Sequence, residues 1–191
     1  MSDRSGLAAR VVGAWRDPAG SWRAEWRADP PEARLLAIAF GASVFLTLGP
    51  LAAETIRPEL ATGEERTPWF AARLLIGLSF LPLSLYAIAA LIGIVSRLCG
   101  GETAAGGSRW QAVRLAFFWS AFASGPFAAL SHAIAAAAGG AAAGSLTAGL
   151  MWLGLFVPML AAAQGFRTLR VALVFASVAA SVFLLAVLGA S

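Results

Sequence analysis

The chain has 191 residues, of which 59% are hydrophobic and 13% charged, with a formal net charge of +4 at pH 7. Its mean hydropathy of +0.77 excludes an ordinary soluble domain, and its length excludes two large domains. The basic residues include no lysine, and this arginine-only, Ala- and Gly-rich composition is typical of a GC-rich bacterial genome.

Residues 1–34 form a polar segment in which tryptophan alternates with arginine, interrupted by prolines at Pro18, Pro30 and Pro31. Tryptophan rings favour the headgroup region of a bilayer, and guanidinium groups favour phosphate. We therefore expect a short cytoplasmic or interfacial helix here; a tail with little structure is the alternative. The candidate interfacial residues are Trp15, Arg16, Trp22, Arg23, Trp26 and Arg27.

Five long apolar stretches follow within residues 35–191, and each approaches or exceeds the ~20 residues that a helix needs to cross a bilayer. Only helices or closed barrels satisfy every backbone group in lipid, and none of the stretches alternates as a barrel strand would. The sequence therefore predicts an all-α polytopic membrane protein, a five-helix transmembrane bundle. The predicted spans are residues 35–53, 73–96, 112–137, 145–164 and 171–189.

The arginines are unevenly divided between the two sides that these spans define. Eleven lie before the first span, around the 97–114 loop or in the 167–170 turn, against three in the 54–73 region. Because cytoplasmic loops carry the excess of basic residues, we expect a cytoplasmic N-terminus and a periplasmic C-terminus in a bacterial inner membrane. The charges gather at bilayer edges, so we expect no nucleic-acid partner.

Two neighbouring segments carry a resemblance to a known family. From Pro82 the chain reads PLSLYAIAALIGIVSRLCGG, and from Arg109 it reads RWQAVRLAFFWSAFASGPFAAL. This pattern resembles the Yip1 domain family, particularly its short bacterial members. The resemblance implies five membrane helices, a cytoplasmic N-terminal segment and no catalytic residues. Eukaryotic members bind Rab-type GTPases, but a bacterial cell has no Rab system, so we do not expect that role.

His132 is the only histidine and lies within the third predicted span. Ionisable groups inside a membrane are functional candidates. A proton relay needs a carboxylate or a second histidine nearby, and no Asp or Glu falls within any predicted span. We therefore expect a neutral His132, hydrogen-bonded between helices. One histidine and one distant cysteine also predict no metal site.

Small and hydroxyl residues form stripes on the second and third predicted spans. Such stripes let helices approach closely and hydrogen-bond in lipid, although they also suit a pore. We expect these two spans to pack together through the stripes, with Phe118, Trp119 and Phe122 turned toward lipid. The candidate packing or polar intramembrane residues are Ser79, Pro82, Tyr86, Gly93, Ser120, Ser124, Pro126, Ser131 and His132.

Two further features bear on mechanism. Pro82, Pro126 and Pro158 lie within successive spans, and broken helices mark many transporter sites, although proline is tolerated in membrane helices. Glu54 and Arg73 flank the first outer loop, and we expect them to pair.

We expect a non-enzymatic, Yip1-like membrane protein that acts through helix–helix or lipid contacts. The alternative is a small transporter or channel that uses the second to fourth spans. No catalytic or cofactor-binding motif occurs, so we predict no cofactor. The expected partners are bilayer lipids together with another integral membrane protein or further copies of the chain.

Overall fold

The computed structural model describes residues 6–27, 30–57, 66–98, 100 and 108–166, and every regular element in these ranges is an α-helix. This confirms the all-α class for the described part of the chain. The predicted span at 171–189 lies outside it. The helices are α1 (Leu7–Arg16), α2 (Pro18–Arg27), α3 (Glu32–Ile56), α4 (Arg66–Leu98), α5 (Arg109–Ala137) and α6 (Ala141–Gln164).

Four of these helices, α3 to α6, are long and apolar enough to cross a membrane. They correspond to the first four predicted spans, and each begins or continues beyond the predicted limits. Most of the extensions contain a charged residue: α3 begins at Glu32, for example, and α4 at Arg66. Such residues suit the headgroup region, where a helix continues after the apolar stretch has ended.

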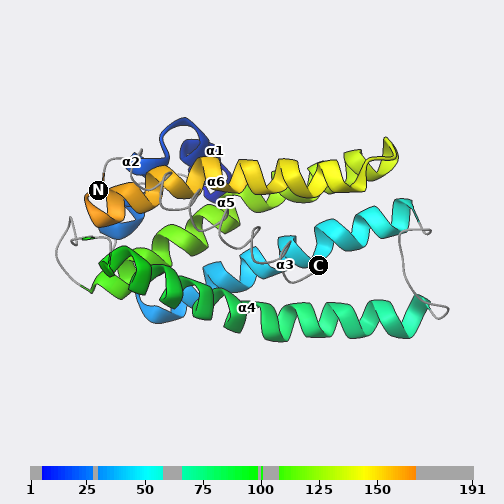
Figure 1. Cartoon of the computed structure of the whole chain (residues 1–191), viewed down its shortest axis with the longest axis horizontal. Helices are drawn as coiled ribbons and strands as arrows, with labels where there is room; N and C mark the ends of the chain where they lie inside the picture. The colour runs from blue at the N-terminus through cyan, green and yellow to red at the C-terminus, as the bar shows by residue number, and fades with distance from the viewer. Residues whose placement is uncertain (1–5, 28–29, 58–65, 99, 101–107, 167–191) are drawn as a thin grey trace, which may run out of the picture.

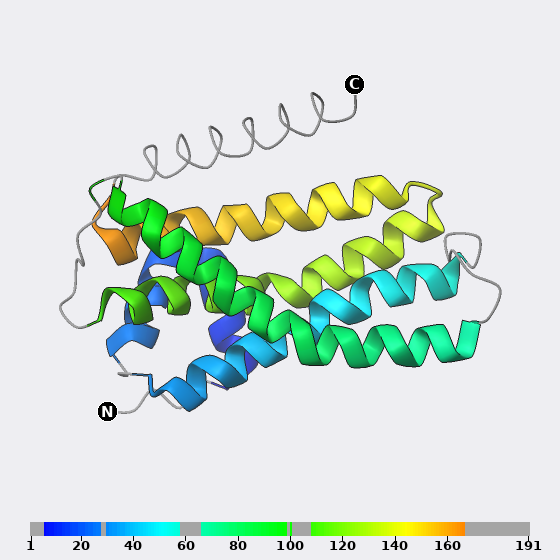
Figure 2. The same ribbon diagram turned by 60° about the horizontal axis from the view of Figure 1, so that its bottom comes forward.

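The four long helices run along the long axis of the molecule, each antiparallel to the next along the chain (Figure 1). The short helices α1 and α2 lie at one end, beside α5 and α6 (Figures 1 and 2). We call α1 and α2 together the hairpin, and the end of the bundle where they lie the hairpin end. The same end holds the start of α3 and of α5. The opposite end, with the α5–α6 turn, is called the turn end.

Helix α5 is the central helix of the bundle. Nearly all its residues from Ala112 to Gly125 are buried, as expected of a helix that is apolar on every side. The predicted exposure of its aromatic residues to lipid is therefore wrong: Phe118 is 0% exposed, Trp119 is 1% exposed, and Phe122 is partly buried. The reason is that each ring meets a neighbouring helix: α1 and α2 cover Trp119, Tyr86 of α4 contacts Phe118, and Phe45 of α3 contacts Phe122.

Helix α4 lies at the edge of the described bundle. Leu75 and Leu83 are 70% and 67% exposed, and further large apolar side chains along the helix are similarly uncovered. The second and third predicted spans do contact each other, through Tyr86 against Phe118 and Gly93 against Trp110, but α4 packs more extensively against α3, and α5 against α3 and α6. The spacing of small residues indicated which helix faces pack closely, but not which helix each face contacts most.

Glycines allow the close helix crossings around α5. A Cβ atom added at Gly49 of α3 would lie 3.1 Å from the Cα atom of Ala129. A Cβ atom at Gly144 of α6 would lie 3.1 Å from the Cα atom of His132. Both α3 and α6 therefore approach the α5 backbone at the same level, near the turn end, as small residues permit in membrane bundles.

Candidate functional site

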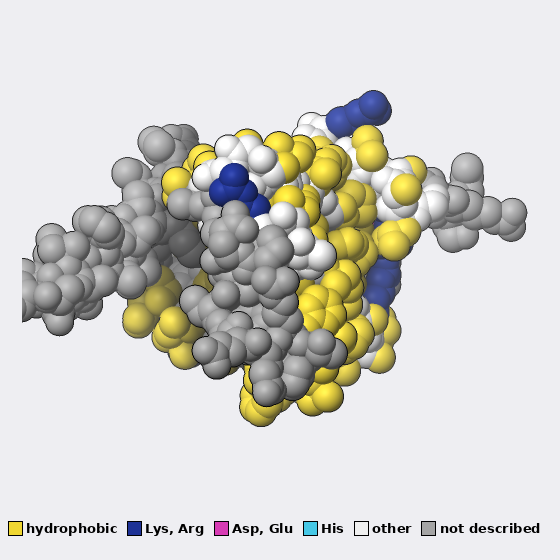
Figure 3. Space-filling model, turned by 90° about the vertical axis from the view of Figure 1, so that its right-hand side faces the viewer, with side chains coloured by type: hydrophobic (Ala, Val, Ile, Leu, Met, Phe, Trp, Pro, Cys, Tyr) yellow, Lys and Arg dark blue, Asp and Glu magenta, His cyan; other side chains and the backbone are white. Residues whose placement is uncertain are grey.

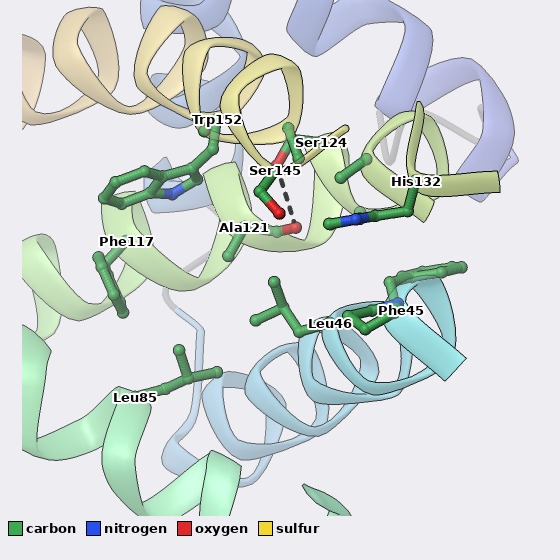
Figure 4. Close-up of a pocket in the computed structure, with 14 residues that line it drawn as sticks. Phe45, Leu46, Leu85, Phe117, Ala121, Ser124, His132, Ser145 and Trp152 are labelled. Carbon is green, nitrogen blue, oxygen red and sulfur yellow. Dashed lines mark hydrogen bonds between the residues drawn. The ribbon is translucent and has the colours of Figure 1, made fainter. Parts of the chain in front are cut away.

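A cavity of about 340 Å³ lies between α3, α4, α5 and α6, in the half of the bundle toward the turn end (Figure 4). Its volume is at the lower end of the ~300–1,000 Å³ range typical of small-molecule sites. The lining residues come from all four long helices. They are Phe45, Leu46, Pro50, Leu85, Phe117, Ala121, Ser124, Gly125, Ala128, His132, Ser145, Ala148, Gly149 and Trp152.

Most of this lining is apolar, and its few polar groups differ in whether they have a hydrogen-bond partner within the protein. The Ser124 hydroxyl donates to the carbonyl of Ala121 over 3.3 Å, within its own helix. Trp152 donates its indole N–H to the Ser120 hydroxyl over 3.2 Å. Figure 4 shows the imidazole of His132 directed into the space between α5 and α3. No described residue forms a hydrogen bond with its ring, which differs from the expected inter-helix bond.

The polar and apolar parts of the lining lie at different depths. His132 and Ser145 are close to the α5–α6 turn, since α5 ends at Ala137 and α6 begins at Ala141. The opposite part of the cavity, toward mid-bundle, is lined by Phe117, Leu85 and the Trp152 ring. The cavity thus has a hydrogen-bonding end near the bundle surface and an apolar end in its middle.

The cavity is also open on one side. Leu46 lines it but remains 41% exposed, although it belongs to a helix that contacts both α4 and α5. The turn end around it is mainly apolar: Figure 3, which faces this end, shows hydrophobic side chains over most of the described surface and arginine only in separate places. The described residues thus leave an opening beside Leu46 in mainly apolar surroundings.

The hairpin end is closed by α1 and α2. Glu25 of α2 is 5% exposed, and its two carboxylate oxygens accept from Arg10 of α1 and Arg34 of α3, each over 2.5 Å. Charge-assisted hydrogen bonds of this kind are stronger than neutral ones. One buried carboxylate thereby connects three helices.

Tryptophan indoles attach the hairpin to α5. Trp15 donates to the Ala123 carbonyl over 3.2 Å, and Trp22 donates to the Ala112 carbonyl over 3.3 Å. In the other direction, Trp119 of α5 donates to the Ser21 hydroxyl over 2.9 Å. The Ala123 carbonyl lies three residues before Pro126, and a proline within a helix opens the preceding turn.

The candidate interfacial residues therefore divide into two groups. Trp22 is 1% exposed and stacks on Trp26 with 5.7 Å between ring centroids, so these rings contact protein rather than project toward headgroups. Arg16, Arg23 and Arg27 are exposed, as expected for groups that contact phosphate or water. The alternation of tryptophan and arginine predicted one short helix, whereas the structure has two and directs the rings of Trp22 and Trp26 toward protein.

Two other ionic groups connect the long helices. At the hairpin end, Glu32 of α3 accepts from the Tyr86 hydroxyl over 2.9 Å and from Arg114 over 2.6 Å. At the turn end, Glu54 pairs with Arg73, which confirms the predicted pair. Carboxylates thus lie toward the ends of the described helices.

The remaining sequence candidates are scattered. Gly93 is buried beneath the Trp110 ring, and Pro82 is buried in α4, whereas Ser79 and Pro126 are exposed. Ser120, Ser124 and Ser131 bond to carbonyls of their own helix, and Ser131 also reaches the Gly144 carbonyl over 3.3 Å. Only Ser124 and His132 line the cavity.

Sequence reasoning missed Ser145, Gly149, Trp152 and Glu25. Gly149 had no signal of its own, because small residues are frequent throughout this chain. Glu25 carried a weak signal: it is one of four acids among the arginines of residues 16–34, and it lies between Trp22 and Trp26.

No protein family, curated protein or solved structure was found to match the chain. The described residues also contain no group of three or more His, Cys, Asp or Glu side chains that could hold a metal ion.

Proposed function

We propose that this chain is a non-enzymatic, Yip1-like integral membrane protein that acts through helix–helix or lipid contacts. The observation that carries the proposal is the character of the cavity: an open, mainly apolar space between long apolar helices. The described carboxylates Glu25, Glu32 and Glu54 all pair with arginine away from it. Such a space suits an apolar occupant better than acid–base chemistry.

The small transporter or channel is less well supported. A path for a polar solute needs polar lining, and here His132, Ser124 and Ser145 are set among apolar side chains. None of the three prolines that suggested broken helices, Pro82, Pro126 and Pro158, lines the cavity.

We further propose five spans in a bacterial inner membrane, with the hairpin end in the cytoplasm. The support is the position of the arginines together with the apolar character of residues 171–189. A reporter fused after Ser191 tests this: alkaline phosphatase is expected to be active there and a cytoplasmic fluorescent reporter dark. The reverse result would overturn the five-span count.

The test of function is purification of the full chain from membranes in mild detergent, followed by native mass spectrometry. We expect retained lipid, a homo-oligomer or a second membrane protein, each seen as a discrete added mass. Harsher detergent should remove the added mass and supplies the control. A bare monomer under all mild conditions would overturn the proposal.

A further inference from the structure

We propose that the cavity binds one acyl chain of a phospholipid from the leaflet at the turn end, with His132 and Ser145 hydrogen-bonded to the lipid's ester group. This inference rests on the proposed role in lipid contacts and names the site and the class of ligand. It is carried by the depth of the polar groups, the dimensions of the cavity and the empty space beside Gly149.

The depth of the polar groups matches the ester region of a bilayer. Helix α5 has 29 residues, a length of about 43 Å against a hydrocarbon core of about 30 Å, so each end extends roughly 6 Å beyond the core. His132 precedes the last residue, Ala137, by five positions, or about 7 Å along the axis. Its imidazole therefore lies near the boundary of the hydrocarbon, where lipid esters are found.

The polar groups also have the hydrogen-bonding capacity that an ester needs. A neutral imidazole has one N–H donor, a serine hydroxyl is another, and an ester carbonyl accepts from either. No described residue hydrogen-bonds the His132 ring, whose N–H is therefore available to a ligand. Ser145 lies across the cavity on α6 and faces the same space (Figure 4).

The rest of the cavity suits a hydrocarbon chain. The lining extends along α5 from His132 to Phe117, about 22 Å along the axis and more than the ~15 Å of hydrocarbon in one leaflet. Apolar cavities stay dry and accept apolar molecules. The exposure of Leu46 provides lateral entry from the surrounding lipid.

Gly149 offers a way to fill the cavity without disturbing the bundle. It lines the cavity, and no atom lies within 4 Å of an ideal Cβ placed on it. A larger side chain there would occupy the space assigned to the acyl chain. Gly154, also on α6, likewise has no atom within 4 Å of such a Cβ but does not line the cavity. The pair Gly149→Leu and Gly154→Leu is therefore a matched test.

The experiment uses the full chain in nanodiscs that contain a phospholipid with a photoreactive diazirine midway along one acyl chain. After irradiation, labelled peptides are mapped and quantified by mass spectrometry. We expect labels on residues 117–128 and 148–152. Gly149→Leu should lower this labelling roughly tenfold, as expected when a buried apolar group loses its space, and Gly154→Leu should leave it unchanged.

The polar end is tested by two substitutions of similar size. His132→Leu removes the donor and should weaken labelling about three- to tenfold, the effect of one lost hydrogen bond on a binding constant. His132→Asn keeps a donor and should restore most of the labelling. Equal labelling in both variants would show that His132 does not bind the ester, and would overturn that part of the proposal.

Three results would overturn the site as a whole. They are cavity labels that Gly149→Leu does not reduce, labels confined to the outer face of α4 around Leu75 and Leu83, and cavity labelling by a photoreactive free fatty acid but not by the phospholipid. Each of these leaves the proposed function standing if lipid or a partner still co-purifies. A bare monomer in native mass spectrometry overturns the function itself. Elution and thermal unfolding of each variant confirm that it is folded.

Discussion

The space between the long helices is filled differently at the two ends of the bundle. At the hairpin end, α1 and α2 fill the space beside α5 with tryptophan rings, and the buried Glu25 is satisfied by two arginines. At the turn end no described segment is inserted between the long helices, and a cavity remains. The difference teaches that the two ends of α5 are packed unequally: one is covered by α1 and α2, and the other borders the cavity that we propose holds a lipid chain.

Of the changes considered, loss of the Trp22 ring at the hairpin end should destabilise the protein most. Trp22→Ala removes a ring that is 1% exposed and leaves a cavity, with an expected cost of about 3–5 kcal/mol in the free energy of unfolding. Trp110→Ala is the matched control, since that ring is 43% exposed and should cost no more than about 1–2 kcal/mol. Reversible unfolding with sodium dodecyl sulfate in mixed micelles measures both. Equal losses would show that the hairpin does not stabilise the bundle.

The carboxylate of Glu25 is the next largest contribution expected. Glu25→Gln leaves Arg10 and Arg34, whose side chains are 31% and 32% exposed, without their counter-charge, at an expected cost of about 2–4 kcal/mol. Glu32→Gln is the control, because the Glu32 side chain is 52% exposed and exposed pairs contribute about 0.2–1 kcal/mol. If the same denaturant titration ranks Glu32→Gln as the more damaging change, the buried cluster is not what holds α1 and α2.

At the turn end, two glycines of α6 should respond in opposite directions. Gly144→Ala places its Cβ 3.1 Å from the His132 backbone, and overpacking of this kind costs about 1–3 kcal/mol. Gly149→Ala meets no atom within 4 Å, and alanine favours a helix over glycine by about 1 kcal/mol. The first variant should unfold at a lower temperature than the parent and the second at the same or a higher one. Destabilisation by both would mean that the gap beside Gly149 is closed, and stabilisation by both would mean that α5 and α6 are not in close contact at Gly144.

Much of the fold was predictable from the sequence. Long apolar runs located α3 to α6, because a helix that crosses lipid needs a continuous stretch free of charge. The Glu54–Arg73 pair was also predictable, since both residues flank one loop between predicted spans and carry opposite charge. Signals of this kind depend on residues close together in the chain or on one helix.

Neighbours in space were not predictable in the same way. The sequence predicts that the aromatic face of α5 contacts lipid. Apolar side chains suit lipid and protein equally well in a membrane, so hydropathy does not distinguish the two. Only the position of α1 and α2 decides that Trp119 is buried. The cavity was missed for a related reason: it is a space where side chains are small, and Gly149 and Ala148 resemble every other small residue in this chain.

The smallest expected effect concerns the ion pair that connects α3 and α4 at the turn end. The side chains of Arg73 and Glu54 are 42% and 16% exposed, so Arg73→Gln should cost about 1 kcal/mol, at the upper end of the range for exposed pairs. Salt screens such pairs, with a Debye length of about 3 Å at 1 M. The difference between variant and parent should therefore shrink when unfolding is measured in 1 M rather than 0.1 M sodium chloride, whereas the Glu25→Gln difference should persist because its carboxylate is only 5% exposed. A salt response shared by both would place the hairpin cluster in water and remove the contrast between the two ends.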